Sequence, residues 1–336
     1  MARPRLASAR TKVKISSLAA KDPANQTKPA STAAAAEAAE SSEAASASAL
    51  DDKAAVNSGG RKRAVLIGCN YINSSCGQLT GCDTDVDIMK AMLMEYYGYK
   101  EDDIICMRDV GTSKDDPTYP SGDNIIKTLC RVVAESKAHD SITVTFSGHG
   151  GSITDQDGDD DSGQDQTICP ADTDENGVIV DDTLNEILVQ ELPRGVRLTA
   201  LFDSCRSGTV CDLPITYHVT GKYKKLKVQA EKLNGSDESV KFVDSGLQFK
   251  GHKYSDVIQF SGCQDDELSQ VDYSTNEYPA GALTRAFARI VVETKGNVSY
   301  IEMMRKLRSE LYTSDFKQTP QMSTSRKFDL TQPLQF

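Results

Sequence analysis

The sequence predicts an α/β fold in which a mostly parallel central sheet is flanked by helices and preceded by a disordered segment. Three observations support this class. From Arg61 onward, short apolar runs alternate with amphipathic helical patterns, which is typical of crossover units. The first sixty residues lack this alternation. Two of the apolar runs end in glycine-flanked loops, and parallel sheets carry their ligand sites beyond such strand ends.

Residues 1–60 differ from the rest of the chain in composition. They contain no Phe, Tyr, Trp, His or Cys, and residues 31–50 include ten alanines. Such a stretch buries too little large apolar surface to offset the entropy of ordering it, so we predict a disordered low-complexity segment. Residues 1–21 carry six Lys or Arg and no acid, which fits either a basic tail or an organelle transit peptide.

The strands are predicted from short runs of apolar residues. The run AVLIGC at 64–69 is a buried strand by this criterion, and the later strands follow the same rule. The predicted strands are 64–69, 104–107, 141–146, 196–202 and 257–260.

The helices are predicted from apolar residues spaced three and four positions apart. In the first of them, Val86, Met89 and Leu93 share one face. The predicted helices are 83–97, 121–137, 183–190, 281–292 and 299–312.

The segment 218–254 breaks the alternation. It is rich in lysine and has weak periodicity, so we predict an exposed connection that contains a hairpin. The connection would divide a single domain, residues 61–336, into a larger region at 61–217 and a smaller one at 255–336.

Charge and cysteine content exclude several classes of protein. A net charge of −11 argues against nucleic acid as a partner, because phosphate binding needs a basic face. The sequence has no apolar run of about 18 residues, so no membrane span is expected. The nine cysteines lack paired spacing, which indicates reduced thiols and a cytoplasmic location.

A cysteine and a histidine stand just beyond two predicted strands. His149 lies in the loop SGHGG after strand 141–146, and Cys205 in the loop DSCRSG after strand 196–202. Parallel strands would bring both loops to one edge of the sheet. A thiolate is a good nucleophile at neutral pH, and a nearby imidazole activates it and later protonates the leaving amine. Backbone N–H groups near Cys205 and Gly150 could face an oxyanion.

Taken alone, either residue would be unremarkable. A single Cys is usually a small core residue, which we expect of Cys69, Cys106 and Cys130. A lone His is usually at the surface or satisfied in the core, which we expect of the remaining three histidines. These are His139, His218 and His252. The pairing of two reactive side chains at two strand ends favours a catalytic dyad of Cys205 and His149.

The two loops closely resemble the two signatures of the metacaspases. The resemblance covers about residues 62–336, and it includes the segments RAVLIG at 63–68, LTGCDTDV at 79–86 and SGCQDD at 261–266. A low-complexity prodomain followed by a large and then a small region is similar to a type I metacaspase. The resemblance implies a caspase-like sheet, a monomer, and a zymogen that is activated by calcium. It also implies cleavage of proteins or peptides after Arg or Lys through a thioester acyl-enzyme.

The resemblance also implies a substrate pocket. Asp85 and Asp203 would pair with the charge of a basic substrate side chain, and Cys82 and Ser147 would line the same pocket. Independently of the family, Asp203 lies two residues before the nucleophile. An acid at position 85 also suits a helix N-terminus, so the two readings of Asp85 are compatible.

The segment between His149 and Arg194 contains many acids and no Lys or Arg. Such uncompensated carboxylates either remain solvated or bind a hard cation. By resemblance, the calcium ligands are Asp165, Asp181, Asp182 and Asp212. Residues 172–177 (DTDENG) also match the first half of an EF-hand loop. The match fails at the twelfth position, where Thr183 replaces the required Glu.

One residue departs from the family pattern. The family usually has His after the nucleophile, and this chain has Arg206. A guanidinium cannot act as a base. This departure leaves a second hypothesis open, a catalytically silent, calcium-dependent interaction protein with the same fold. A third hypothesis is a redox sensor that uses Cys205 with Cys211 or Cys82. For the enzyme, the candidate self-cleavage sites are the basic triplet Arg61–Arg63 and the connection Lys222–Lys253.

Overall fold

The computed structural model describes most of the chain from Gly59 onward. The described residues are 59–72, 74–154, 164–205, 207–208, 210–219, 240–244, 251, 255–263, 270–272, 279–314, 316 and 318–336. The chain divides into Met1–Ser58 and Gly59–Phe336, and the first of these units is outside the described residues. The predictions for the acidic run Asp155–Asp161, for Arg206 and for most of 218–254 are also outside them.

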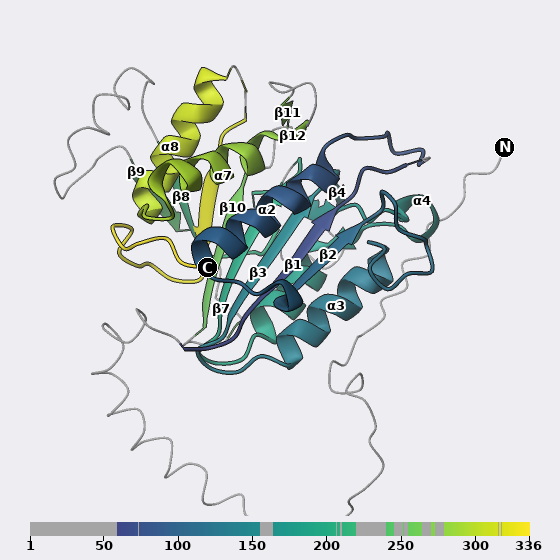
Figure 1. The fold of residues 1–336 in the computed structure, drawn as a ribbon, viewed down its shortest axis with the longest axis horizontal. Coiled ribbons are helices and arrows are strands. Elements are labelled where there is room, and N and C mark those ends of the chain that lie inside the picture. Colours follow the sequence, from purple (N-terminus) through teal and green to yellow (C-terminus); the bar gives the residue numbers. More distant parts are fainter. Residues whose placement is uncertain are drawn as a thin grey trace, which may run out of the picture. The chain divides into compact units, whose positions relative to one another are not determined.

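An eight-stranded sheet forms the centre of the second unit (Figure 1), in the order β2-β1-β3-β7-β10-β13-β8-β9. The first five strands pair in parallel, and the last three add antiparallel pairs. The predicted mostly parallel α/β sheet is therefore confirmed. The strands are β1 (Lys62–Gly68), β2 (Ile104–Arg108), β3 (Ser141–Ser147), β7 (Arg197–Asp203), β8 (Ile215–Val219), β9 (Val240–Asp244), β10 (Asp256–Ser261) and β13 (Gln321–Thr324).

Four longer helices lie close to their predicted positions. Ser121 begins α3 by accepting a hydrogen bond from the backbone N–H of Asn124, and Ser299 and Glu302 form a capping box that begins α8. The longer helices are α2 (Cys82–Tyr97), α3 (Gly122–Ala134), α7 (Ala282–Thr294) and α8 (Tyr300–Thr313). The shorter ones are η3 (Glu101–Asp103), α4 (Thr173–Asn176), α5 (Asp181–Asn185) and the π-helix η4 (Glu186–Gln190). The single helix predicted at 183–190 is thus two consecutive short ones.

The largest hydrophobic cluster lies between the sheet and the helices α2, α7 and α8, which are neighbours in Figure 1. Alternate residues of each strand face these helices, such as Leu66 of β1 and Phe260 of β10. Phe260 is fully buried and meets Phe287 of α7 edge-on, with ring centroids 5.2 Å apart. Contacts of α7 with α2 and of β10 with β7 hold the smaller C-terminal region against the larger one.

Two small sheets were not predicted from the sequence. The strands β4 (Gly150–Thr154), β5 (Gln164–Ile168) and β6 (Ile179–Val180) form one, and β11 (Val271–Asp272) pairs with β12 (Ala280–Gly281) in the other. Their sequences are polar or very short, so they give no apolar run for a sequence-based prediction to detect. β8 and β9 pair as antiparallel neighbours, and they extend the central sheet.

The basic triplet Arg61–Arg63 is a poor cleavage site in the folded chain. Lys62 and Arg63 belong to β1, and Arg63 is buried with its guanidinium 3.0 Å from the carboxylate of Glu135. Arg61 is paired with Asp103 and its carbonyl accepts from the backbone of Ser141. A protease would have to pull β1 out of the sheet to reach these bonds, so the candidate site at Arg61–Arg63 is not supported.

We expect Phe260→Ala to lower the free energy of unfolding by about 3–5 kcal/mol, because it leaves a cavity between β10 and α7. Chemical denaturation with urea measures this change. Val292→Ala is the matched control, since Val292 lies on α7 with its side chain 53% exposed. A loss for Phe260→Ala no larger than that of the control would contradict the assigned core.

Candidate active site

The register of two strands places the loops of His149 and Cys205 side by side. β3 and β7 pair in parallel, with Ser147 opposite Asp203 at their ends. His149 and Cys205 each follow two residues later, so two loops of equal reach leave neighbouring strands, which are about 4.8 Å apart. The loops touch. A Cβ on Gly150 would lie 2.1 Å from the carbonyl oxygen of Cys205, and only glycine allows this approach.

The orientation of His149 is fixed by three contacts. Its Nε2 lies 2.7 Å from the carbonyl oxygen of Gly77. Since a carbonyl only accepts hydrogen bonds, Nε2 is the nitrogen that carries a proton, and in the neutral tautomer this leaves the lone pair on Nδ1. The ring packs on Tyr71, with centroids 4.7 Å apart. The backbone N–H of His149 donates to the Tyr71 hydroxyl at 2.7 Å, and that hydroxyl donates to the Cys169 carbonyl at 2.6 Å.

The loop that follows Cys205 is held from inside the sheet. Gln259, buried in β10, donates from Nε2 to the carbonyl oxygens of Ser207 and Gly208 at 2.8 and 3.0 Å. The Ser207 hydroxyl donates to the carbonyl of Ser204 at 2.9 Å. Cys205 itself is half-buried, so a substrate can still reach this residue although the loop after it is held in place.

The four side chains predicted to bind substrate come together at the same sheet edge. We call Cys82, Asp85, Ser147 and Asp203 the acidic cluster, and all four are buried. Ser147 donates from its hydroxyl to Oδ2 of Asp85 and also lies beside the Cys82 thiol.

Backbone groups of the C-terminal region complete the acidic cluster. The N–H of Gly281 donates to both oxygens of Asp85, at 2.9 and 3.1 Å, and the N–H of Thr284 donates to Oδ2 of Asp203 at 2.9 Å. A Cβ on Gly281 would lie 2.1 Å from Asp203 and 2.9 Å from Asp85. Residue 281 therefore has to be glycine for the cluster to close.

Two neighbouring buried carboxylates resist simultaneous ionisation. Burial and the adjacent Asp203 carboxylate raise the pKa of Asp85 well above its ordinary value, and the hydrogen bonds from Ser147 and Gly281 only partly oppose this. The nearby Arg285 also opposes the rise in the Asp85 pKa. A cation placed between Asp85 and Asp203 would favour ionisation of both, so the cluster is suited to bind a positively charged group.

The predicted calcium ligands come from three segments that approach one another. Asp181 is buried and its Oδ2 accepts from the backbone N–H of Gln166 at 2.6 Å, next to the buried Asp165. Asp182 is the next residue, and its backbone N–H donates a hydrogen bond to Oδ1 of Asp181. Asp181 and Asp212 are both close enough to the Cys211 thiol to contribute to the rise of its pKa.

The donor set fits calcium in its chemistry, because carboxylate oxygens are the ligands this ion prefers. The arrangement is not a finished metal centre. In the part of the chain that the structure describes, no three His, Cys, Asp or Glu side chains are grouped so that they could hold a metal ion as they stand. The four acids would have to draw closer to share an ion.

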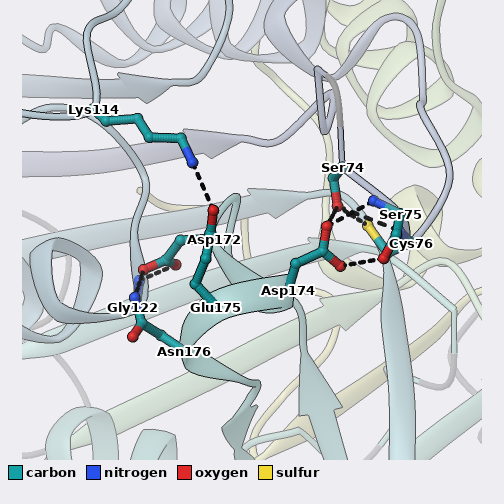
Figure 2. A network of polar contacts seen from close by, with 9 residues as sticks. All are labelled: Ser74, Ser75, Cys76, Lys114, Gly122, Asp172, Asp174, Glu175 and Asn176. Atoms are coloured by element: carbon teal, nitrogen blue, oxygen red, sulfur yellow. Dashed lines mark hydrogen bonds and ion pairs between the residues drawn. The ribbon is translucent and has the colours of Figure 1, made fainter.

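The partial EF-hand match at 172–177 has a different structural role (Figure 2). Asp172 accepts from the backbone N–H of Gly122 at 2.8 Å, at the start of α3, and from the side chain of Asn176 at 2.7 Å. Asp174 accepts hydrogen bonds from Ser74 and Ser75. These two acids of the motif bind protein donors on separate sides of α4.

The two thiols proposed as redox partners of Cys205 are poorly suited to that role. Burial raises the pKa of both Cys82 and Cys211 well above the ordinary value, so neither forms a thiolate readily. All nine cysteines are free thiols. Cys69 and Cys130 are buried as expected of core residues, while Cys106 is half-buried on the edge strand β2. His139 is exposed.

Several site residues were missed by the sequence reasoning. Tyr71 and Gly77 follow β1, and Gln259 is an interior residue of β10. A usable signal existed for the first two. The strand 64–69 ends at the same edge as the strands before His149 and Cys205, so the polar loop after it also had to face the site. Nothing in the sequence around Gln259 separates it from an ordinary strand residue.

Comparison with known proteins found a matching family model and similar proteins. The family model described as metacaspase, peptidase C14 domain, matches residues 62–214, which include His149 and Cys205. Metacaspase-1 of Schizosaccharomyces pombe is 36% identical over 298 residues, covering 81% of this chain and 69% of the relative. Metacaspase-1 of Saccharomyces cerevisiae S288c is 35% identical over 305 residues, covering 82% and 69%.

Two solved structures share the fold. A protein from Geobacter sulfurreducens superposes with a TM-score of 0.53 at 22% identity, covering 81% of this chain and 97% of that one. Caspase-1 from Spodoptera frugiperda superposes with a TM-score of 0.50 at 11% identity, covering 80% and 87%. The predicted caspase-like fold is confirmed.

We expect Asp85→Asn to gain stability relative to the unmodified chain as the pH rises. In the unfolded chain Asp85 titrates near its ordinary pKa of 3.8, whereas burial raises the pKa in the folded chain. The folded chain therefore binds more protons between the two values, and its free energy of unfolding falls as the pH rises through that window. Asparagine removes this dependence. Urea denaturation at about pH 4.5 and about pH 7.5 measures the difference.

The control for this prediction is Asp123→Asn, which removes a charge from an exposed position in the first turn of α3. Its stability difference from the unmodified chain should stay nearly constant over the same pH range. A constant difference for Asp85→Asn as well would contradict the raised pKa.

Proposed function

The chain belongs to the metacaspase family of cysteine peptidases, and on that premise we propose that it is a calcium-activated endopeptidase that cleaves after Arg or Lys. The observation that supports the proposal is the β3–β7 register, in which Ser147 is opposite Asp203, so that the loops of His149 and Cys205 leave neighbouring strand ends beside the acidic cluster. Cys205 is the nucleophile and His149 the general base.

The reaction follows from the tautomer of His149. With Nε2 donating to Gly77, Nδ1 takes the proton of the Cys205 thiol. The thiolate attacks the substrate carbonyl carbon, and the imidazolium then gives its proton to the leaving amine, so the peptide C–N bond breaks and a thioester forms. Water, deprotonated by His149, hydrolyses the thioester and releases the carboxylic acid product. The thiol and the neutral imidazole are regenerated.

The acidic cluster supports specificity for a basic residue. A guanidinium or ammonium between Asp85 and Asp203 would relieve the repulsion that raises the pKa of Asp85. An acidic substrate side chain would add a third negative charge and be rejected, as expected for a site that excludes the wrong partner by repulsion. Substrate specificity thus has an electrostatic cause in this chain.

Calcium activation is supported by the chemistry of Asp165, Asp181, Asp182 and Asp212. A bound ion would supply positive charge that draws these carboxylates together. Asp212 lies in the segment after Cys205. Asp165 lies in β5, which pairs with β4, the strand that follows His149. An ion bound by both acids would therefore link the two catalytic loops. The segment Lys222–Lys253 remains the candidate for self-cleavage, largely outside the described residues.

We expect purified protein to cleave a fluorogenic Arg or Lys peptide in the presence of calcium, and an Asp peptide far more slowly. Cys205→Ala should lose more than about 10³-fold in kcat/KM, since the covalent route is removed. Cys106→Ala, which removes a thiol from the edge strand β2, is the matched control. No turnover under any condition would favour the catalytically silent interaction protein, and turnover retained by Cys205→Ala would exclude Cys205 as the nucleophile.

We expect Asp181→Asn to raise the calcium concentration for half-maximal activity by at least about 10-fold, because a carboxylate ligand becomes a weaker neutral one. Glu191→Gln, an exposed acid of the same segment, is the control. Calorimetric titration of Cys205→Ala protein with calcium, with and without Asp181→Asn, measures binding apart from turnover. Equal calcium affinity in both proteins would contradict the assignment.

A further inference from the structure

The carbonyl that orients His149 comes from an exposed loop. Gly77 lies between β1 and α2, and the loop is closed at its base by the backbone bond from Leu79 N–H to the carbonyl of Asn70, at 2.9 Å. Residues 75–78 are all exposed. Gly77 has a φ of +100°, which strongly favours glycine, so its carbonyl direction depends on an unusual backbone conformation. Hydrophobic packing does not hold this tip of the loop.

The carboxylate of Asp109 holds the start of the loop through the N–H groups of Asn70 and Ile72, and the carboxylate of Asp174 holds its tip (Figure 2). Asp174 of α4 accepts from the backbone N–H and the hydroxyl of Ser75, both at 2.6 Å, and from the hydroxyl of Ser74 at 2.8 Å. We call these three hydrogen bonds the Asp174 clamp. Ser74 also restrains the backbone that leads to Gly77, because its hydroxyl accepts a hydrogen bond from the backbone N–H of Cys76 at 3.3 Å. Gly77 is the next residue.

The clamp is charge-assisted. Hydrogen bonds to an ionised carboxylate are stronger than those between neutral groups. The same bonds lower the pKa of Asp174, the hydroxyl of Ser75 contributing most. The carboxylate is therefore ionised at neutral pH, with Ser74 and Ser75 as its donors.

We propose that Asp174 is a positioning residue for catalysis, which fixes the loop at Ser74–Gly77 so that the Gly77 carbonyl holds Nε2 of His149. This inference rests on the proposed function, because it takes His149 to be the general base. Without the clamp the loop tip gains freedom, and the imidazole loses the acceptor that fixes its ring and tautomer. A displacement of about 1 Å in such a group is enough to cost a large factor in rate.

The clamp also connects α4 to the proposed active site. The residues of α4 follow β5, the strand that carries Asp165, and they precede Asp181. The segment 164–182 thus contacts, through Asp174, the loop whose Gly77 carbonyl orients His149, and it also contains three of the predicted calcium ligands.

The test compares Asp174→Asn with Glu175→Gln. Both remove one charge from neighbouring exposed positions of α4, but Glu175 pairs only with the exposed Lys114 among the contacts described here. We expect Asp174→Asn to lower kcat on the Arg peptide by about 10- to 100-fold with KM changed less than about twofold. Glu175→Gln should match the unmodified enzyme in both.

A second readout needs no turnover. The rate at which iodoacetamide alkylates Cys205 at neutral pH, followed by peptide mass spectrometry, reports how well His149 activates the thiol. We expect this rate to fall about as much as kcat in Asp174→Asn. Asp174→Glu, which keeps the charge, should recover part of both losses. An unchanged alkylation rate in Asp174→Asn overturns the inference.

Substituting the two serines removes the hydrogen-bond donors of the clamp and leaves Asp174 in place. This provides a test that does not depend on whether Asp174→Asn folds correctly. The double variant Ser74→Ala with Ser75→Ala should lower kcat in the same direction, and adding Asp174→Asn to it should cost little more, since both act through one contact. Fully additive losses overturn the inference. If the unmodified chain shows no Cys205-dependent cleavage, the proposed function fails, whereas a failure of the clamp leaves that cleavage intact and unaffected by Asp174→Asn.

Discussion

The functional arrangement depends on one constraint, the parallel register between β3 and β7. Because Ser147 is opposite Asp203, the two segments leave the sheet at the same level, and the loops of His149 and Cys205 start side by side. A shift of one strand by one residue would turn its end residue, Ser147 in β3 or Asp203 in β7, to the opposite face of the sheet. The acidic cluster and the proposed catalytic pair thus depend on a single set of backbone hydrogen bonds. Gly150 allows the second part of the arrangement, the contact between the loops.

The C-terminal region is part of this site and not only a support for it. Gly281 and Thr284 donate backbone N–H groups to the two carboxylates, at the point where β12 ends and α7 begins. A helix start provides donors that have no partner within the helix, and here two acids of the larger region accept them. The fit is close enough to exclude any side chain at residue 281. Packing of α7 on α2 and the proposed specificity for substrate charge are therefore linked.

The main elements were predictable because their signals are local. The strand at 64–69 and the helix at 83–97 have long apolar patterns, and His149 and Cys205 stand directly after two such strands. The role of Asp174 has no such local signal. Its sequence context matched half a calcium loop, yet its contacts are with serines about a hundred residues earlier. Only the folded chain brings those donors to it. The same holds for Gln259 and Gly281, whose partners lie far away along the chain, in the loop after β7 and in α2.

The order of strands has a consequence for the fate of a nicked chain. β7 and β8 precede the segment 220–239, and β9, β10 and β13 follow it. In the sheet these strands alternate, since β10 and β13 lie between β7 and β8, and β9 lies outside β8. A break anywhere in 220–239 would leave two fragments interleaved in one sheet, with three strand-to-strand ladders joining them. Such fragments would co-purify and separate only on denaturation, so a chain that is cut there keeps its architecture.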